Sequence, residues 1–203
     1  MNRLVIIGAS GHGKVVADIA EKNGYTSIIF LDDNQNVKSC GVYSVVGGCN
    51  EAASYRDSDF IVAIGNSKIR QKIQFELCNK GLNVVSLIHP SATVASHVEI
   101  GEGTVVMAGA VINPFTKIGK GCIVNTCASV DHDCIVSDYA HISVGAHVAG
   151  TVTIGEGTWI GAGATVINNT NVCSDCMIGA GAVVVKSIEK SGIYIGVPAK
   201  EKI

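Results

Sequence analysis

Branched aliphatic residues recur every six positions along the second half of the chain. Stepping by six from Val94 to Val184 meets sixteen positions, and every one of them holds Val or Ile. A period of six is typical of parallel β-helices, in which each short strand directs one side chain inward. The residue two places before each member is small or short, as at Ala110 and Thr116. The pattern predicts an unbroken three-sided prism of about five coils, each of three strands.

The first 88 residues follow a different pattern. An apolar run from Leu4 to Ile7 precedes a glycine-rich stretch, and apolar residues then recur at helical spacing. Further apolar runs cover 28–31 and 60–64, and a second helix is expected over 67–80. Alternating strands and helices of this kind predict an α/β domain with a small Rossmann-like parallel sheet. We therefore expect three segments, with the sheet domain over 1–88, the all-β prism over 89–187 and a C-terminal tail over 188–203.

Composition agrees with a mostly β chain and excludes several functions. The sequence holds 24 Ile and 27 Val but only 5 Leu, and its net charge is −2. This charge gives no cationic surface, so we expect no nucleic-acid partner and no membrane partner. The sequence has no apolar run of the length that a bilayer requires, and its N-terminus shows no export signal. These features predict a cytoplasmic protein whose eight cysteines are reduced.

Three cysteines fall on the small-residue column of the prism. Cys122, Cys134 and Cys176 occupy corner positions where Ala or Thr stands elsewhere, so we interpret them as packing residues. Cys173 and Cys176 have C-x-x-C spacing, but we expect the coil to direct their side chains differently. No second such pair exists to complete a zinc site. The sequence therefore predicts no metal and no redox role for this pair.

A glycine loop follows the first strand. Gly8, Gly11 and Gly13 would let backbone N–H groups and a helix N-terminus approach a phosphate. His12 and Lys14 in the same loop favour an anion site, although a purely structural turn is the alternative. An acidic residue at the end of the second strand could accept hydrogen bonds from a ribose.

The densest group of ionisable residues in the prism lies just after an inward valine. Asp131 and His132 fall at a turn, and a histidine polarised by a neighbouring carboxylate is a suitable general base near neutral pH. The alternative is a solvated turn. His141 lies nine residues further on, half a coil away, so the two histidines cannot readily share one site within one chain. If both contribute, the sites lie between subunits, and a charge-poor three-sided prism suits a homotrimer.

Several motifs resemble those of the sugar acyltransferases of the left-handed β-helix class, and most closely the PglD and NeuD type, over essentially the whole length. The matching segments are Ile7-Gly8-Ala9-Ser10-Gly11-His12-Gly13-Lys14, Phe30-Leu31-Asp32-Asp33, Ala63-Ile64-Gly65-Asn66 with Arg70, His89-Pro90, Asn125 to Asp133 with His141, and Ile195 to Lys200. The resemblance implies a left-handed prism and an acetyl-CoA-dependent N-acetyltransferase of bacterial glycan biosynthesis. Its substrate would be the 4-amino group of a UDP-linked 4-amino-4,6-dideoxy sugar, acetylated directly in a ternary complex.

The resemblance also implies residue roles. His132 would be the general base and Asp131 its carboxylate partner, although Asp133 is the alternative orienting group, since Asp131 is shorter than the Glu that similar proteins carry before the base. His141 would lie near the thioester at the subunit boundary. The nucleotide sugar would be held by Ser10, Gly11, His12, Gly13, Lys14, Asp32, Asp33, Gly65, Asn66 and Arg70, and the pantetheine arm by the backbone of Gly150, Ala162 and Ala180.

Three other functions stay open at this point. A NeuD-type enzyme would acetylate a hydroxyl of sialic acid, but it would need a cationic clamp for the carboxylate. A zinc lyase of the γ-carbonic anhydrase type would need closely spaced histidine ligands, and the spacings of nine and six from His132 through His141 to His147 do not supply them. A catalytically silent protein that binds a sugar nucleotide is the third alternative.

Overall fold

The computed structural model describes residues 3–202, and the chain divides into two compact units, Met1–Pro90 and Ser91–Ile203. Neither of the two α-helices in the described residues is long and apolar enough to cross a membrane.

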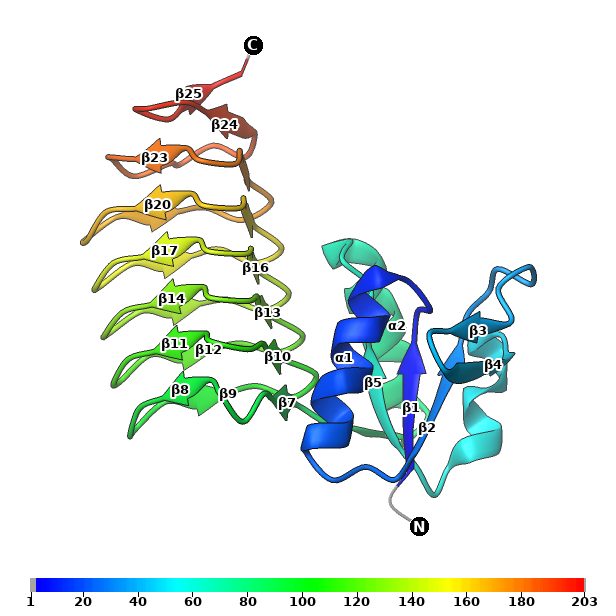
Figure 1. Cartoon of the computed structure of the whole chain (residues 1–203). Coiled ribbons are helices and arrows are strands. Elements are labelled where there is room, and N and C mark those ends of the chain that lie inside the picture. Colours follow the sequence, from blue (N-terminus) through cyan, green and yellow to red (C-terminus); the bar gives the residue numbers. More distant parts are fainter. Residues whose placement is uncertain (1–2, 203) are drawn as a thin grey trace. The chain divides into compact units, whose positions relative to one another are not determined.

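The first unit is built on a six-stranded sheet in the order β3-β4-β2-β1-β5-β6 (Figure 1). β1 pairs in parallel with β2 on one side and with β5 on the other. Its strands are β1 Arg3–Ile7, β2 Ser27–Leu31, β3 Ser39–Cys40, β4 Tyr43–Gly47, β5 Asp59–Val62 and β6 Asn83–Val84. The next strand, β7 Leu87–Ile88, is not part of this sheet. The helices are α1 Gly11–Lys22, the 3₁₀ helix η1 Cys49–Tyr55 and α2 Ser67–Asn79.

The three central strands and both α-helices confirm the α/β prediction from hydrophobic periodicity. β1 reads as a continuous apolar run because it lies between two parallel neighbours, with Leu4 to Ile7 fully buried. The short outer strands β3, β4 and β6 were not predicted. Half-exposed strands of two to five residues carry too little hydrophobic signal to be distinguished from loops.

The second unit is a stack of two-residue strands at six-residue spacing. Each strand up to Thr165–Val166 pairs in parallel with the one eighteen residues later, as Val106 does with Val124 and Val124 with Ile142. Figure 1 shows these strands as successive coils, coloured from green to orange. They are β8 Thr93–Val94, β9 Glu99–Ile100, β10 Val105–Val106, β11 Val111–Ile112, β12 Lys117–Ile118, β13 Ile123–Val124, β14 Ser129–Val130, β15 Ile135–Val136, β16 His141–Ile142, β17 His147–Val148, β18 Thr153–Ile154, β19 Trp159–Ile160, β20 Thr165–Val166, β21 Asn171–Val172, β22 Met177–Ile178 and β23 Val183–Val184.

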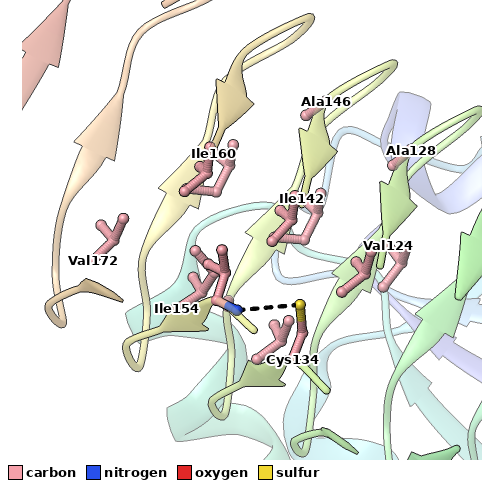
Figure 2. Packing of buried hydrophobic residues seen from close by; sticks show 14 of the residues in the cluster. Val124, Ala128, Cys134, Ile142, Ala146, Ile154, Ile160 and Val172 are labelled. Carbon is pink, nitrogen blue, oxygen red and sulfur yellow. Dashed lines mark hydrogen bonds between the residues drawn. The ribbon is translucent and has the colours of Figure 1, made fainter. Parts of the chain in front are cut away.

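The branched column forms the core of this prism. Fourteen of its members, from Val106 to Val184, are buried, and Val94 and Ile100 in the first coil are partly buried against the same cluster. Figure 2 shows how Val124, Ile142 and Ile160 lie one above another through successive coils. The prediction of an uninterrupted parallel β-helix is confirmed, since a spacing of eighteen residues places every sixth side chain on the inner face.

The small-residue column fills the inner corners as predicted. Cys122, Cys134 and Cys176 are buried there as free thiols. Threonines at the same positions turn their hydroxyl groups to the backbone, and Thr104 Oγ1 donates to the carbonyl of Gly119 at 2.8 Å. A corner therefore accepts a small polar side chain whose hydrogen bonds are satisfied locally.

One expectation about the cysteines is wrong. Cys173 and Cys176 do not point in different directions, because their sulfur atoms lie 3.4 Å apart across the turn before β22. The hexad pattern places Cys176 inward but says nothing about Cys173, and the tight turn between them, with Asp175 at φ 55°, brings the two side chains together.

The C-terminal segment continues the prism. Ile188 bridges to Val172, β24 Ile193–Ile195 pairs in parallel with β22, and β25 Lys200–Glu201 returns antiparallel to β24. The last described residues therefore cover the final coil.

Candidate functional site

Backbone geometry shapes the glycine loop between β1 and α1. Gly8 has φ +104°, and a Cβ at Gly13 would lie 2.4 Å from the carbonyl oxygen of Gly8, so neither position tolerates a side chain. Ser10 is the N-cap residue of α1, but its hydroxyl makes no capping hydrogen bond. Gly11 next to it is exposed, and the first N–H groups of a helix have no intrahelical acceptor, so this end of α1 suits an anion.

His12 is largely buried behind this loop. Burial and the nearby positive charge of Arg70 lower the pKa of His12 to about 4, so its imidazole is neutral at pH 7. Its Nε2 atom is buried and makes no hydrogen bond to any residue within 3–202. His12 therefore brings a neutral polar group to the loop, and Lys14, which is exposed, is the cation there.

The acidic pair after β2 holds the neighbouring loops. Asp32 accepts hydrogen bonds from the Ala9 N–H at 2.7 Å and the Asn34 N–H at 2.8 Å. Asp33 accepts from the Cys49 N–H at 2.8 Å. Both carboxylates also line a polar cavity of about 420 Å³ between the β2 end, β4 and η1. The glycine loop and this cavity thus meet at the carboxyl end of β1 and β2, where parallel sheets bind ligands.

The predicted residues after β5 have structural contacts. Asn66 caps α2 by accepting a hydrogen bond from the Ile69 N–H at 3.0 Å. Arg70 is 1% exposed, and its guanidinium donates to the carbonyls of Ile64 and Gly65 at 2.7 and 2.9 Å. Arg70 therefore fixes the shape of the loop at Gly65 from inside the protein.

In the second unit, His132 stands on the turn after β14. Its Nδ1 lies 2.7 Å from the carboxylate of Asp133, and more than half of each side chain is exposed. The pKa of His132 is raised, first by the hydrogen bond to Asp133 and then by the negative charge of Asp131 and Asp133. Within the described chain the Nε2 atom makes no hydrogen bond, and it lies on the side of the ring next to Gly150.

Asp131, the carboxylate named with His132 in the sequence analysis, is engaged elsewhere. Its Oδ1 accepts from Asn113 Nδ2 at 2.7 Å and from the backbone N–H of His132 at 2.8 Å. These two hydrogen bonds lower the pKa of Asp131. The imidazole itself is oriented by Asp133, the alternative that the sequence left open, while Asp131 shapes the turn that carries the ring.

Gly150 lies directly beside the imidazole, one coil further along the prism. A Cβ at this position would approach Cε1 and Nε2 of His132 to 2.7 Å. The Gly150 carbonyl accepts from the Asn169 N–H, whereas the Gly150 N–H donates to no residue among 3–202. The structure thus brings a position predicted for the pantetheine arm into contact with the predicted base.

A mainly apolar cleft of about 460 Å³ runs over the sheet that contains β13, β16, β19 and β22. Three of the predicted cofactor positions, His141, Ala162 and Ala180, line it. The other lining residues are Asn125, Ser143, Val144, Trp159, Gly161, Met177, Ile178 and Gly179. An apolar groove with a few polar atoms at one end suits a long, flexible acyl carrier.

The polar end of this cleft is built by side chains from three successive coils. Asn125 Oδ1 accepts from the Thr126 N–H, which directs Asn125 Nδ2 toward His141 Nε2 at 3.1 Å. The His141 ring stacks on Trp159 with centroids 5.2 Å apart, and Trp159 Nε1 donates to Ser143 Oγ. Sequence reasoning missed Trp159 and Met177. Both are large apolar residues at outward positions of the hexad, which was the available signal.

His132 and the cleft belong to different faces of the prism. His132 follows β14 in the sheet of β8, β11, β14, β17, β20 and β23, whereas His141 lies on β16 in the neighbouring sheet. The cleft lining does not include His132. Among residues 3–202, no group of three or more His, Cys, Asp or Glu side chains is arranged to hold a metal ion.

Comparison with known proteins assigns a family to each of the two units. Residues 3–77 match the PglD N-terminal domain, and residues 151–186 match the bacterial transferase hexapeptide family of six repeats. The chain is 30% identical to a GDP-perosamine N-acetyltransferase of Escherichia coli O157:H7 over 168 residues, which cover 79% of this chain and 76% of that protein. The chain belongs to the PglD-type sugar N-acetyltransferases of the left-handed β-helix class.

Two solved structures are similar to this chain over its whole length. The acetyltransferase domain of PglB from Neisseria gonorrhoeae FA1090, solved in complex with acetyl coenzyme A, is 43% identical, with a TM-score of 0.96 over 100% of both chains. PerB from Caulobacter crescentus, solved in complex with CoA and GDP-perosamine, is 39% identical, with a TM-score of 0.94 over 100% of this chain and 98% of that one.

Proposed function

We propose that this protein transfers the acetyl group of acetyl-CoA to the 4-amino group of a nucleoside-diphosphate-linked 4-amino-4,6-dideoxy sugar, with His132 as general base. The observation that carries the proposal is the 2.7 Å contact between His132 Nδ1 and Asp133, which leaves Nε2 as the proton acceptor. The similarity to enzymes that act on or bind GDP-perosamine supports the substrate class.

The reaction then proceeds by direct attack of the sugar amine on the thioester carbonyl. His132 Nε2 accepts the proton that the amine loses as the C–N bond forms, and the imidazolium returns a proton to the departing thiolate of CoA. Asp133 holds the ring with Nδ1 protonated and stabilises the imidazolium. The N–H of Gly150, which has no acceptor within the described residues, is the donor that we assign to the developing oxyanion.

We also propose that the active site lies between subunits of a homotrimer. His132 and the apolar cleft are on different sheets of one prism. A site that combines the two would therefore need the base of one copy to meet the cleft of a neighbouring copy. The exposed Trp159 and Met177 in the cleft would be covered in that arrangement. Cyclic symmetry gives every subunit the same pair of faces, which produces three equivalent sites.

The front unit supplies the site for the nucleotide. The N-terminus of α1 with Gly11, Gly13 and Lys14 suits a diphosphate, and the cavity beside Asp32 and Asp33 suits the nucleoside. Arg70 is buried on backbone carbonyls and so is not placed to clamp the carboxylate of a sialic acid. This disfavours O-acetylation of sialic acid. Uridine is our prediction for the nucleoside, and guanosine is the alternative that the relatives suggest.

A thiol-release assay with acetyl-CoA tests the proposal. UDP- and GDP-linked 4-amino-4,6-dideoxy sugars and their 4-hydroxy counterparts serve as acceptors, and free sialic acid is included. Turnover with a 4-amino sugar nucleotide supports the assignment. Turnover with sialic acid alone, or with no acceptor in the panel, contradicts it.

Variants then test the catalytic residue and the shared site. His132→Ala should lose turnover but keep sugar-nucleotide binding in calorimetry, whereas unaltered turnover would exclude His132 as the base. Trp159→Ala should also lose turnover, because it removes a wall of the cleft. Mixing its subunits with His132→Ala subunits should then restore activity, because some sites combine an intact base with an intact cleft. A mixture that stays inactive after verified subunit exchange would place both residues in one chain's site.

A further inference from the structure

The turn before β22 carries a pair of thiols that the acetyl transfer does not use. Cys173 Sγ and Cys176 Sγ lie 3.4 Å apart, and both cysteines are free. A disulfide requires a sulfur separation of about 2.05 Å. Closing the gap from 3.4 Å to this bond length would need each sulfur to move by less than about 1 Å.

The backbone of this turn is already clamped. Thr158, one coil below, donates its hydroxyl to the carbonyl of Cys173 at 2.7 Å and accepts from the N–H of Cys176 at 3.1 Å. The Cys173 N–H in turn donates to the carbonyl of Ile188 at 2.9 Å. These contacts fix both ends of the four-residue turn, so the two thiols are held near each other.

The arrangement is specific to the last coils of the prism. Cys122 and Cys134 occupy the same kind of inner corner as Cys176. The residues three places before them are Gly119 and Asp131, where Cys176 has Cys173. All three corner thiols make weak hydrogen bonds to backbone carbonyls about fifteen residues further on, Cys122 to Ser137 and Cys134 to Ala149 at 3.1 Å and Cys176 to Lys190 at 3.7 Å, but only Cys176 also has a thiol partner. They are natural internal controls for any chemistry of the pair.

The two thiols differ in access. Cys176 is 2% exposed, and burial, followed by the hydrogen bond to Cys173, raises its pKa to about 12. Cys173 is half-buried and is the one that an oxidant can reach. Oxidation begins at the accessible thiol, and a neighbouring thiol then resolves the product.

We propose that Cys173 and Cys176 form an oxidisable dithiol that hydrogen peroxide converts into an intrachain disulfide. Peroxide first oxidises the Cys173 thiol to a sulfenic acid and is itself reduced to water. The sulfur of Cys176 then attacks the sulfenic sulfur, the S–O bond breaks, and the hydroxyl leaves as a second water with the proton of Cys176. A dithiol reductant reverses the reaction and restores both thiols.

Intact-mass measurement and peptide mapping of the full native chain test this inference. Exposure to limited peroxide should lower the mass by two hydrogen atoms, protect two thiols from alkylation and yield a cross-linked peptide joining Cys173 to Cys176. Cys122→Ser and Cys134→Ser should behave as the unmodified chain does. Cys173→Ser should form no such bond. Cys176→Ala, which places at the corner the residue found at Ala164 and Ala182, should form none either.

Peroxide should form the Cys173–Cys176 disulfide and a dithiol reductant should remove it, over repeated cycles. The circular dichroism spectrum of the folded protein should stay unchanged throughout. A native chain that keeps all its thiols, that gains oxygen atoms at Cys173 without a cross-link, or that forms its disulfide elsewhere overturns the proposal. Because the mapping is made on the unmodified chain, a failure of either variant to fold does not affect this result. The readout is also independent of acetyl transfer.

Discussion

Gly150→Ala should displace the imidazole of His132 without changing any catalytic side chain. The added methyl would lie 2.7 Å from Cε1 and Nε2 of His132, whereas ordinary contact begins near 3.4 Å. The ring must therefore move by at least about 0.7 Å, since the methyl is fixed to the backbone of a packed coil. Misplacing a reacting group by about 1 Å costs on the order of a hundredfold in rate. We expect kcat to fall by about tenfold to a hundredfold.

Steady-state kinetics of the acetyl transfer measure this effect. KM for acetyl-CoA and for the sugar nucleotide should stay near the value of the unmodified protein, because the Gly150 N–H is retained. Gly145→Ala is the matched control: the methyl meets no atom within 4 Å, and its φ of +60° confines the cost to backbone strain. The Gly145 variant should therefore lose thermal stability without a comparable loss of kcat.

Two results would refute the reasoning. A Gly150→Ala enzyme with unchanged kcat would show that the ring of His132 is not held at a catalytic position by this glycine. A rise in KM for acetyl-CoA at unchanged kcat would instead indicate that Gly150 contacts the pantetheine arm, the role that the resemblance implied.

Asp133→Asn should lower kcat and move the acid limb of the pH–rate profile to lower pH, because Asp133 is the first cause of the raised pKa of His132 and the neutral imidazole is the active form. Asp131→Asn should move that limb less, and the opposite order would make Asp131 the orienting group. Ile142→Ala, at a fully buried position of the column, should cost about 2–5 kcal/mol in the free energy of unfolding, and a loss below about 1 kcal/mol in denaturant titrations would contradict the packing. Trp159 is the only tryptophan in the chain, so its fluorescence should change on titration with CoA, and an unchanged signal at saturating CoA would remove it from the acyl-carrier cleft.

The candidate site shows how far reasoning from sequence reached. The stretch around His132 could be identified because outward polar residues stand out against a strict hexad. The choice between Asp131 and Asp133 could not, since both carboxylates neighbour the histidine in sequence and only the turn geometry decides which of them meets Nδ1. Arg70 illustrates the reverse case. The resemblance implied that Arg70 would hold the nucleotide sugar, but its side chain is buried on backbone carbonyls of the same loop.

The amino-acid sequence by itself determined the architecture of both units. A core side chain at every sixth position can be buried only if the backbone turns once in eighteen residues, so a one-dimensional period specifies the prism. Apolar runs alternating with helical spacing specify the parallel sheet in the same way. Only the tertiary structure decided which distant side chains meet, such as Gly150 with His132, Trp159 with His141 and Cys173 with Cys176. Those contacts depend on turn dihedrals and on neighbouring coils, and the hexad period carries information about neither the outward rotamers nor the turns.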